Sequence, residues 1–157
     1  MLKYVNFDIV FREVPDEVTL AVNLSRCPCH CEGCHSPQLQ TDTGEELTLE
    51  VVNGLLEQYK HTITCFCFMG GDATPLEVAE LAAAIKPQIK TAWYSGRTEL
   101  PPHFPLQAFN YIKLGPYIEA FGPLDHPTTN QRMYRVTPLR QLEDITPMMR
   151  YGTRFGN

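Results

Sequence analysis

The sequence lacks any apolar run close to the roughly 20 residues that a membrane-spanning helix requires. Residues 1–8 also lack the apolar segment and small-residue cleavage site of a signal peptide. Lysine and arginine form no cluster, and the net charge of −5 argues against non-specific binding to nucleic acid. We therefore expect a cytoplasmic protein that binds neither membranes nor nucleic acids.

Internal repeats, linkers and low-complexity segments are also missing. A chain of 157 residues is long enough for one domain with a hydrophobic core. We predict a single domain over residues 1–157, with its core at about 18–136 and a C-terminal hairpin and tail at 133–157.

Strand and helix patterns alternate along the chain. Thr48 is the expected N-cap of the first helix, and Thr74 with Pro75 and Glu77 predicts a capping box for the second. The last two predicted strands form a terminal hairpin. The predicted strands are 18–24, 62–69, 91–94, 111–114, 133–136 and 142–145, and the predicted helices cover 51–59 and 75–85.

This alternation predicts an α/β fold with right-handed βα units and a largely parallel sheet. A full eight-fold barrel needs about 250 residues, so the chain predicts a partial (β/α) barrel that is open on one side. Chemistry in barrels sits at the carboxyl ends of the strands. A cysteine-rich loop and the segment Gly70-Gly71-Asp72 both follow such ends.

Four of the six cysteines, Cys27, Cys29, Cys31 and Cys34, lie within eight residues. Reducing compartments disfavour disulfides, so this crowding indicates a metal site. Cys27, Cys31 and Cys34 have a C-x3-C-x2-C spacing. Three thiolates can bind three irons of a cubane cluster and leave the fourth iron without a protein ligand.

Two alternatives stay open for these cysteines. A zinc site could include His30 and His35, although structural zinc usually takes two well-separated ligand pairs. Cys65 and Cys67 share one face of a strand, where free cysteine is commonly a small buried apolar residue. Cys29 could also replace one of the three cluster ligands, but we predict that it is not a ligand.

The cysteine loop, followed by a glycine pair after the next strand, resembles the radical S-adenosylmethionine superfamily. Within it, the chain most resembles the activating proteins of the anaerobic (class III) ribonucleoside-triphosphate reductase. The resemblance covers about residues 18–136. Its segments are the Cys-x3-Cys-x-Gly-Cys-His loop at 27–35, Met-Gly-Gly-Asp at 69–72, Trp-Tyr-Ser-Gly at 93–96, Gly-Pro-Tyr-Ile at 115–118 and Thr-Asn-Gln-Arg at 129–132.

The chain departs from that family at a few positions. Met69 replaces the serine before the glycine pair, and the proline that usually follows the acidic residue comes later, at Pro75. Leu114 stands where an aspartate often precedes Gly-Pro, and residues 14–17 replace a glycine-rich stretch before the first predicted strand.

The resemblance implies a radical-SAM-type barrel with one 4Fe-4S cluster held by Cys27, Cys31 and Cys34. It implies that S-adenosylmethionine binds the unique iron and is cleaved by one electron. The resulting radical would take hydrogen from a backbone glycine of the large subunit of the anaerobic reductase. A reducing electron donor such as flavodoxin would be the second partner.

The same resemblance implies that cofactor contacts come from Gly33, Cys34, His35, Gly70, Gly71 and Asp72. Glycine lets the methionine end of S-adenosylmethionine approach the backbone, and Asp72 is either an acceptor for its ammonium group or a turn residue. Trp93 and Tyr94 either line the adenine or belong to the core. The polar segment 130–132 is expected to face a partner or the cofactor, because burying it unpaired is costly.

Other functions remain compatible with the sequence. The chain could activate a different glycyl-radical enzyme or be another small radical enzyme, such as a deazapurine-modifying synthase. A non-catalytic module that binds zinc or carries electrons is the alternative from a different class.

Overall fold

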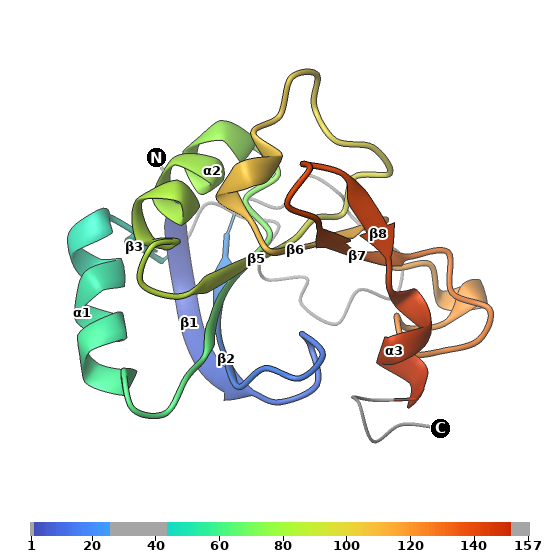
Figure 1. The fold of residues 1–157 in the computed structure, drawn as a ribbon, viewed down its shortest axis with the longest axis horizontal. Coiled ribbons are helices and arrows are strands. Elements are labelled where there is room, and N and C mark those ends of the chain that lie inside the picture. The colour runs from blue at the N-terminus through green and yellow to red at the C-terminus, as the bar shows by residue number, and fades with distance from the viewer. Residues whose placement is uncertain (1, 26–43, 152–157) are drawn as a thin grey trace.

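The computed structural model describes residues 2–25 and 44–151, and these form one eight-stranded sheet with helices packed against it. The strand order is β3-β1-β2-β4-β5-β6-β7-β8 (Figure 1). The strands are β1 (Lys3–Val10), β2 (Thr19–Leu24), β3 (Glu45–Glu46), β4 (Cys65–Met69), β5 (Lys90–Tyr94), β6 (Tyr111–Leu114), β7 (Arg132–Val136) and β8 (Leu142–Asp144). The helices are α1 (Leu49–Tyr59), α2 (Pro75–Ile85) and α3 (Thr146–Tyr151), with 3-10 turns η2 (Leu106–Ala108) and η3 (Glu119–Phe121).

The four central strands β2, β4, β5 and β6 are parallel, as the alternation of strand and helix predicted. Both flanks are antiparallel, with β1 beside β2 and the β7–β8 hairpin beside β6. The sequence analysis assigned no strand before residue 18, and β1 corrects that. Within β1 the stretch 5–9 alternates apolar and polar residues, which is the pattern of a half-buried strand.

The two helix starts differ from one another. Thr48 caps α1, because its side-chain oxygen accepts a hydrogen bond from the Val51 backbone N–H at 3.2 Å. Thr74 precedes Pro75 at the start of α2, but its side chain makes no capping hydrogen bond. The predicted capping box is therefore wrong, while the predicted start of the helix is right.

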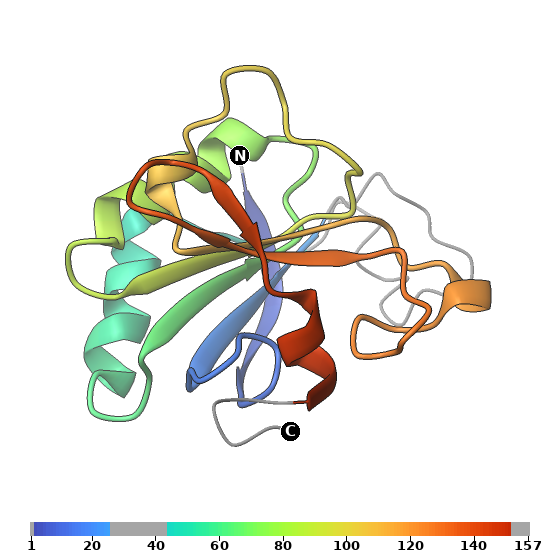
Figure 2. The same ribbon diagram turned by 45° about the vertical axis from the view of Figure 1, so that its right-hand side comes forward.

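Side chains of the parallel strands alternate between two cores. Leu20, Phe66 and Trp93 point to the face that α1 and α2 cover, and they belong to the larger core. Cys67 and Ala92 point to the opposite face, where α3 and the loop after β1 contribute to a smaller core (Figure 2). We call this opposite side the helix-poor face. Within the described residues no helix is long and apolar enough to cross a membrane.

A buried carboxylate connects the amino ends of the parallel strands. Glu17, which is 5 % exposed, accepts hydrogen bonds from Thr64 Oγ1 at 2.7 Å, Lys90 Nζ at 2.8 Å and Tyr111 Oη at 3.0 Å. These three donors lie at or just before the first residues of β4, β5 and β6, and Glu17 lies two residues before β2. We call this group the Glu17 tie.

Candidate functional site

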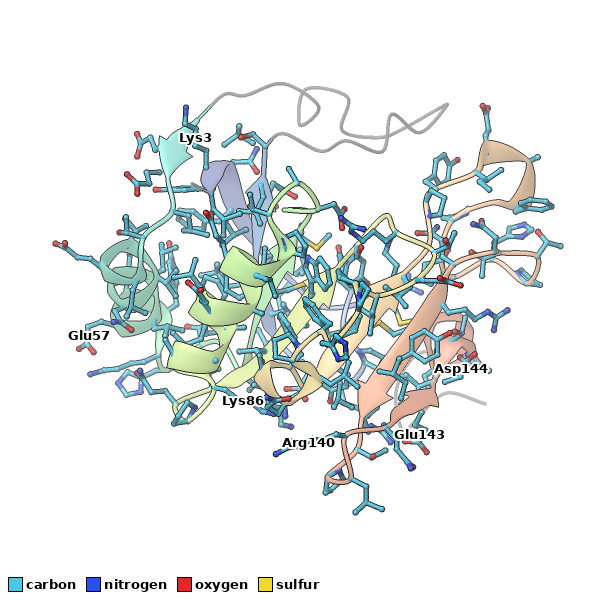
Figure 3. All side chains as sticks on the ribbon, turned by 90° about the horizontal axis from the view of Figure 1, so that it is seen from above. Lys3, Glu57, Lys86, Arg140, Glu143 and Asp144 are labelled. Atoms are coloured by element: carbon cyan, nitrogen blue, oxygen red, sulfur yellow. The ribbon has the colours of Figure 1, made fainter. Side chains whose placement is uncertain are left out.

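The segment that carries the four clustered cysteines begins and ends at one edge of the sheet. Ser25 follows β2 and donates its backbone N–H to the carbonyl oxygen of Lys3 at 3.0 Å (Lys3 is labelled in Figure 3). After the segment, Glu46 pairs with Lys3 in the ladder between β3 and β1. Gly44 fits there because its φ is +96° and a Cβ would lie only 2.2 Å from the Tyr4 carbonyl oxygen.

Residues 26–43 lie outside the described part of the chain. The predicted ligands Cys27, Cys31 and Cys34, the alternative ligand Cys29, and the predicted cofactor contacts Gly33 and His35 all fall there. Among the described residues, no group of three or more histidine, cysteine, aspartate or glutamate side chains could hold a metal ion. The donor set for a cluster therefore stays the predicted one, with soft thiolates of the kind that hold iron–sulfur clusters.

Gly70, Gly71 and Asp72 form the turn after β4, at the carboxyl edge of the parallel strands. β2 and β4 are adjacent parallel strands, and Asn23 pairs with Met69 just before both strands end. A Cβ on Gly70 would lie 3.4 Å from the Leu24 carbonyl oxygen, one residue before Ser25. The start of the cysteine segment is therefore beside this turn, which we call the glycine turn.

The core itself requires glycine at position 71. Its φ is +81°, and a Cβ would lie 2.6 Å from Val78 Cγ2 and 2.9 Å from Leu24 Cδ1. Gly70 also has a left-handed φ of +102°. Local packing thus explains Gly71 without a ligand, and its contact with a cofactor stays a prediction.

Asp72 is 2 % exposed, and its carboxylate is bound within the protein. Ser95 Oγ donates to one carboxylate oxygen at 2.5 Å, and the Gly96 N–H donates to the other at 3.0 Å. The guanidinium of Arg97 donates to the Asp72 backbone carbonyl at 3.1 Å. These contacts give Asp72 a structural role between the ends of β4 and β5, and its predicted bond to an ammonium group stays untested.

The two aromatic residues of β5 point to opposite faces. Trp93 is fully buried and stacks on Phe104 with ring centroids 5.0 Å apart, so it is a core residue, and its indole N–H donates to the Gly70 carbonyl at 2.7 Å. Tyr94 lies on the helix-poor face, and its hydroxyl donates to the Glu13 carbonyl. Burial raises the pKa of Tyr94, as do nearby acidic groups, so the hydroxyl stays protonated.

Tyr94 also lines a pocket of about 690 Å³ on the helix-poor face. Its walls come from the loop after β1, the segment 123–125 and α3. The lining is mostly apolar, with Val10, Leu124 and Met149 among its members. This pocket has room for a small organic group or a short stretch of peptide.

The polar segment 130–132 is partly buried in the structure. Gln131 is 6 % exposed, and Asn130 Nδ2 donates to the Pro116 carbonyl at 3.0 Å. Arg132 is the most exposed of the three, and its guanidinium lies 3.4 Å from an Asp144 carboxylate oxygen. Asn130 and Gln131 therefore pack at the turn around Gly115, and the expected contact of this segment with a partner or the cofactor stays a prediction.

Sequence analysis missed Lys113, a lysine that is 8 % exposed on the helix-poor face of β6. Its Nζ donates to the carbonyl oxygens of Ser95 and Gly115, each at 3.0 Å, and lies 5.3 Å from the centre of the Tyr94 ring. The sequence could have indicated this residue, because a lysine between Ile112 and Leu114 is unusual in a buried strand.

Comparison with known families identifies the chain only at the level of its metal centre. No curated protein and no solved structure matches it. A family model described as a 4Fe-4S single cluster domain matches residues 17–98, which is more than half of the chain. The match runs from the Glu17 tie through the cysteine segment and the glycine turn to the end of β5. The chain therefore belongs to the family of 4Fe-4S single cluster domains, and it is an iron–sulfur protein.

Proposed function

We propose that this protein is a radical S-adenosylmethionine enzyme that makes a glycyl radical on the large subunit of anaerobic ribonucleoside-triphosphate reductase. One observation carries the proposal. The cysteine segment of an iron–sulfur protein starts beside the glycine turn, at the carboxyl edge of four parallel strands. In α/β folds this edge is where small ligands bind.

The proposed roles divide between the cofactors and the chain. Cys27, Cys31 and Cys34 would hold the cluster, which would supply the one electron needed to cleave S-adenosylmethionine into methionine and a 5′-deoxyadenosyl radical. That radical takes a hydrogen atom from a glycine Cα of the partner, giving 5′-deoxyadenosine and a glycyl radical. Gly33, Cys34, His35 and the glycine turn bind and orient the methionine end, and a donor such as flavodoxin provides the electron.

The fold proposed for this activity is a partial (β/α) barrel. Two features support it: four parallel strands with α1 and α2 on one face, and an opposite face that few helices cover. The pocket beside Tyr94 opens on that helix-poor face. A peptide segment of the partner would enter from this side.

The proposal is tested by reconstituting the cluster and measuring cleavage of S-adenosylmethionine under anaerobic conditions. Protein reconstituted with iron and sulfide should contain about four irons per chain, and dithionite with S-adenosylmethionine should then yield 5′-deoxyadenosine. Cys31→Ser is the inactive control, and Cys65→Ala is the matched control that keeps activity, because Cys65 is buried in β4.

Adding the large reductase subunit should then give a glycyl-radical doublet in electron paramagnetic resonance. Cleavage without that doublet would leave a radical enzyme with another target. Intact S-adenosylmethionine beside a redox-active cluster would make the protein an electron carrier and overturn the proposal.

A further inference from the structure

The carboxyl ends of β4, β5 and β6 are joined by buried polar side chains. Asp72 follows β4, Ser95 follows β5, and Lys113 is the second-to-last residue of β6. All three are less than a tenth exposed. Buried polar groups are kept only where they are hydrogen-bonded, so their arrangement is set by specific partners.

Ser95 is the centre of this group because it binds both of the others. Its hydroxyl donates to the Asp72 carboxylate at 2.5 Å, and its carbonyl accepts from Lys113 Nζ at 3.0 Å. Its backbone N–H donates to the Lys113 carbonyl at 2.9 Å. Ser95 thus binds the Asp72 carboxylate through its hydroxyl and the Lys113 ammonium through its backbone carbonyl. We call these three residues the Ser95 network.

The Ser95 network holds the glycine turn from its C-terminal side. Asp72 is the residue after Gly71, and its carboxylate is fixed by Ser95 and Gly96. The N-terminal side is fixed separately, since the Gly70 N–H donates to the Tyr94 carbonyl at 2.9 Å. Both glycines have a left-handed φ and great conformational freedom, so these flanking bonds decide the shape of the turn.

Lys113 adds to this effect from the neighbouring strand. Its ammonium bridges the carbonyls of Ser95 and Gly115, which holds the ends of β5 and β6 together. The ammonium also lies over the ring of Tyr94. The backbone carbonyl of Tyr94 accepts the hydrogen bond from the Gly70 N–H. Removing the ammonium would therefore loosen both attachments of the glycine turn.

We propose that Ser95 and Lys113 are positioning residues, which preset the glycine turn for the methionine end of S-adenosylmethionine. The inference rests on the proposed function, because it takes the glycine turn as the binding element. It assigns neither residue to the cluster. Loss of the network should weaken cofactor binding and leave the cluster intact.

The test compares Ser95→Ala and Lys113→Met with Glu17→Gln in the reconstituted protein. Glu17 makes a buried tie of similar kind at the opposite ends of the same strands, so it controls for lost stability alone. Iron content and the resonance of the reduced cluster without S-adenosylmethionine should match wild type in all three. The dissociation constant for S-adenosylmethionine should rise about tenfold in the first two and stay unchanged in Glu17→Gln.

Ser95→Thr keeps the hydroxyl and should restore most of the affinity. The inference is overturned if Ser95→Ala and Lys113→Met bind S-adenosylmethionine as wild type does, or if Glu17→Gln binds it equally weakly. Lost iron in Ser95→Ala and Lys113→Met also contradicts it, because the network would then support the cluster.

Hydrogen exchange separates this inference from the proposed function. Without S-adenosylmethionine, the amides of residues 70–74 should exchange faster in Ser95→Ala and Lys113→Met than in wild type. Unchanged exchange would overturn the positioning role. Wild-type protein that binds no S-adenosylmethionine would overturn the proposed function instead, whatever the exchange rates of the turn.

Discussion

At the scale of single residues, the chain contains two populations of cysteine. Cys65 and Cys67 are fully buried on the helix-poor face of β4, where they behave as small apolar side chains. Burial raises the pKa of the Cys65 thiol to about 12, and the charge of Glu17 adds to the effect. Burial also raises the pKa of Cys67 well above its usual value. Both side chains are therefore protonated thiols at neutral pH.

We predict that Cys65 and Cys67 resist alkylation by iodoacetamide in the folded protein at pH 8. A thiol whose pKa is about 12 is ionised in only roughly one molecule in ten thousand at that pH. Peptide mass spectrometry measures the modification, and urea-unfolded protein provides the fully reactive control. Rapid labelling of either cysteine before unfolding would contradict the assignment.

The ligand register of the cysteine segment has its own test. Cys31→Ser should abolish the cluster, because it removes the central thiolate of the C-x3-C-x2-C spacing, while Cys29→Ser should keep most of the iron. Iron analysis after anaerobic reconstitution measures both variants, with Cys67→Ala as the control. A cluster that survives Cys31→Ser and not Cys29→Ser would show that Cys29 is a ligand and Cys31 is not.

At the scale of elements, the parallel strands are held at both ends by polar side chains. The Glu17 tie joins their amino ends, and the Ser95 network joins the carboxyl ends of β4, β5 and β6. Between these ends the contacts are apolar, with Phe66 and Phe68 on one face of β4 and the two cysteines on the other. The polar ends fix the register of strands whose middles are uniformly apolar.

We predict that Glu17→Gln lowers the free energy of unfolding by about 1–3 kcal/mol, because an amide cannot accept from all three donors and leaves one or more of them unpaired. Lys90 is half exposed, so the buried hydroxyls of Thr64 and Tyr111 account for most of the loss. Urea denaturation measures the change.

Glu57→Gln is the matched control. Glu57 of α1 pairs with Lys60, the residue after the helix, and points away from the sheet into solvent (Figure 3). Its variant should keep the wild-type midpoint of unfolding, since exposed ion pairs contribute little to stability. Equal midpoints for both variants would rule out the Glu17 tie as a stabilising feature.

At the scale of the whole molecule, the described residues build two hydrophobic cores on the faces of one sheet. The largest fully buried side chains include Trp93, Phe66, Phe68 and Phe109, and all belong to the core beneath α1 and α2. A core of this kind supplies folding free energy without any metal. The protein differs in this respect from zinc fingers, whose folding depends on their ion.

We therefore predict that removing the cluster leaves the fold intact. Protein treated with a chelator and an oxidant should keep its far-ultraviolet circular dichroism and a cooperative thermal transition, because the cores remain. Wild-type protein with its cluster provides the reference. A metal-free protein without a cooperative transition would show that the cluster organises the whole chain.

Most of the main elements could be predicted in order and type from the sequence, although β1 was not. Periodicity located β2, α1, α2, β5, β6 and the β7–β8 hairpin, because apolar spacing reports which face each residue buries. It placed the start of β4 at Thr62 instead of Cys65. The Thr62 and Ile63 N–H groups bond back to the Tyr59 carbonyl at the end of α1, and no local pattern signals that turn. The cysteine spacing pointed to a cluster, and the family match agrees with it.

Which polar residues contact one another follows from the pairing of the strands and could not be read from the sequence. Ser95 lies 23 residues from Asp72 and 18 residues from Lys113, and no local sequence pattern connects the three. Strand pairing brings them together at one edge, where Asp72 binds Ser95 instead of facing outward. The same holds for Glu17, whose partners lie 47, 73 and 94 residues away. Local propensity fixes elements, but a polar network needs burial and register, and these exist only once the sheet has formed.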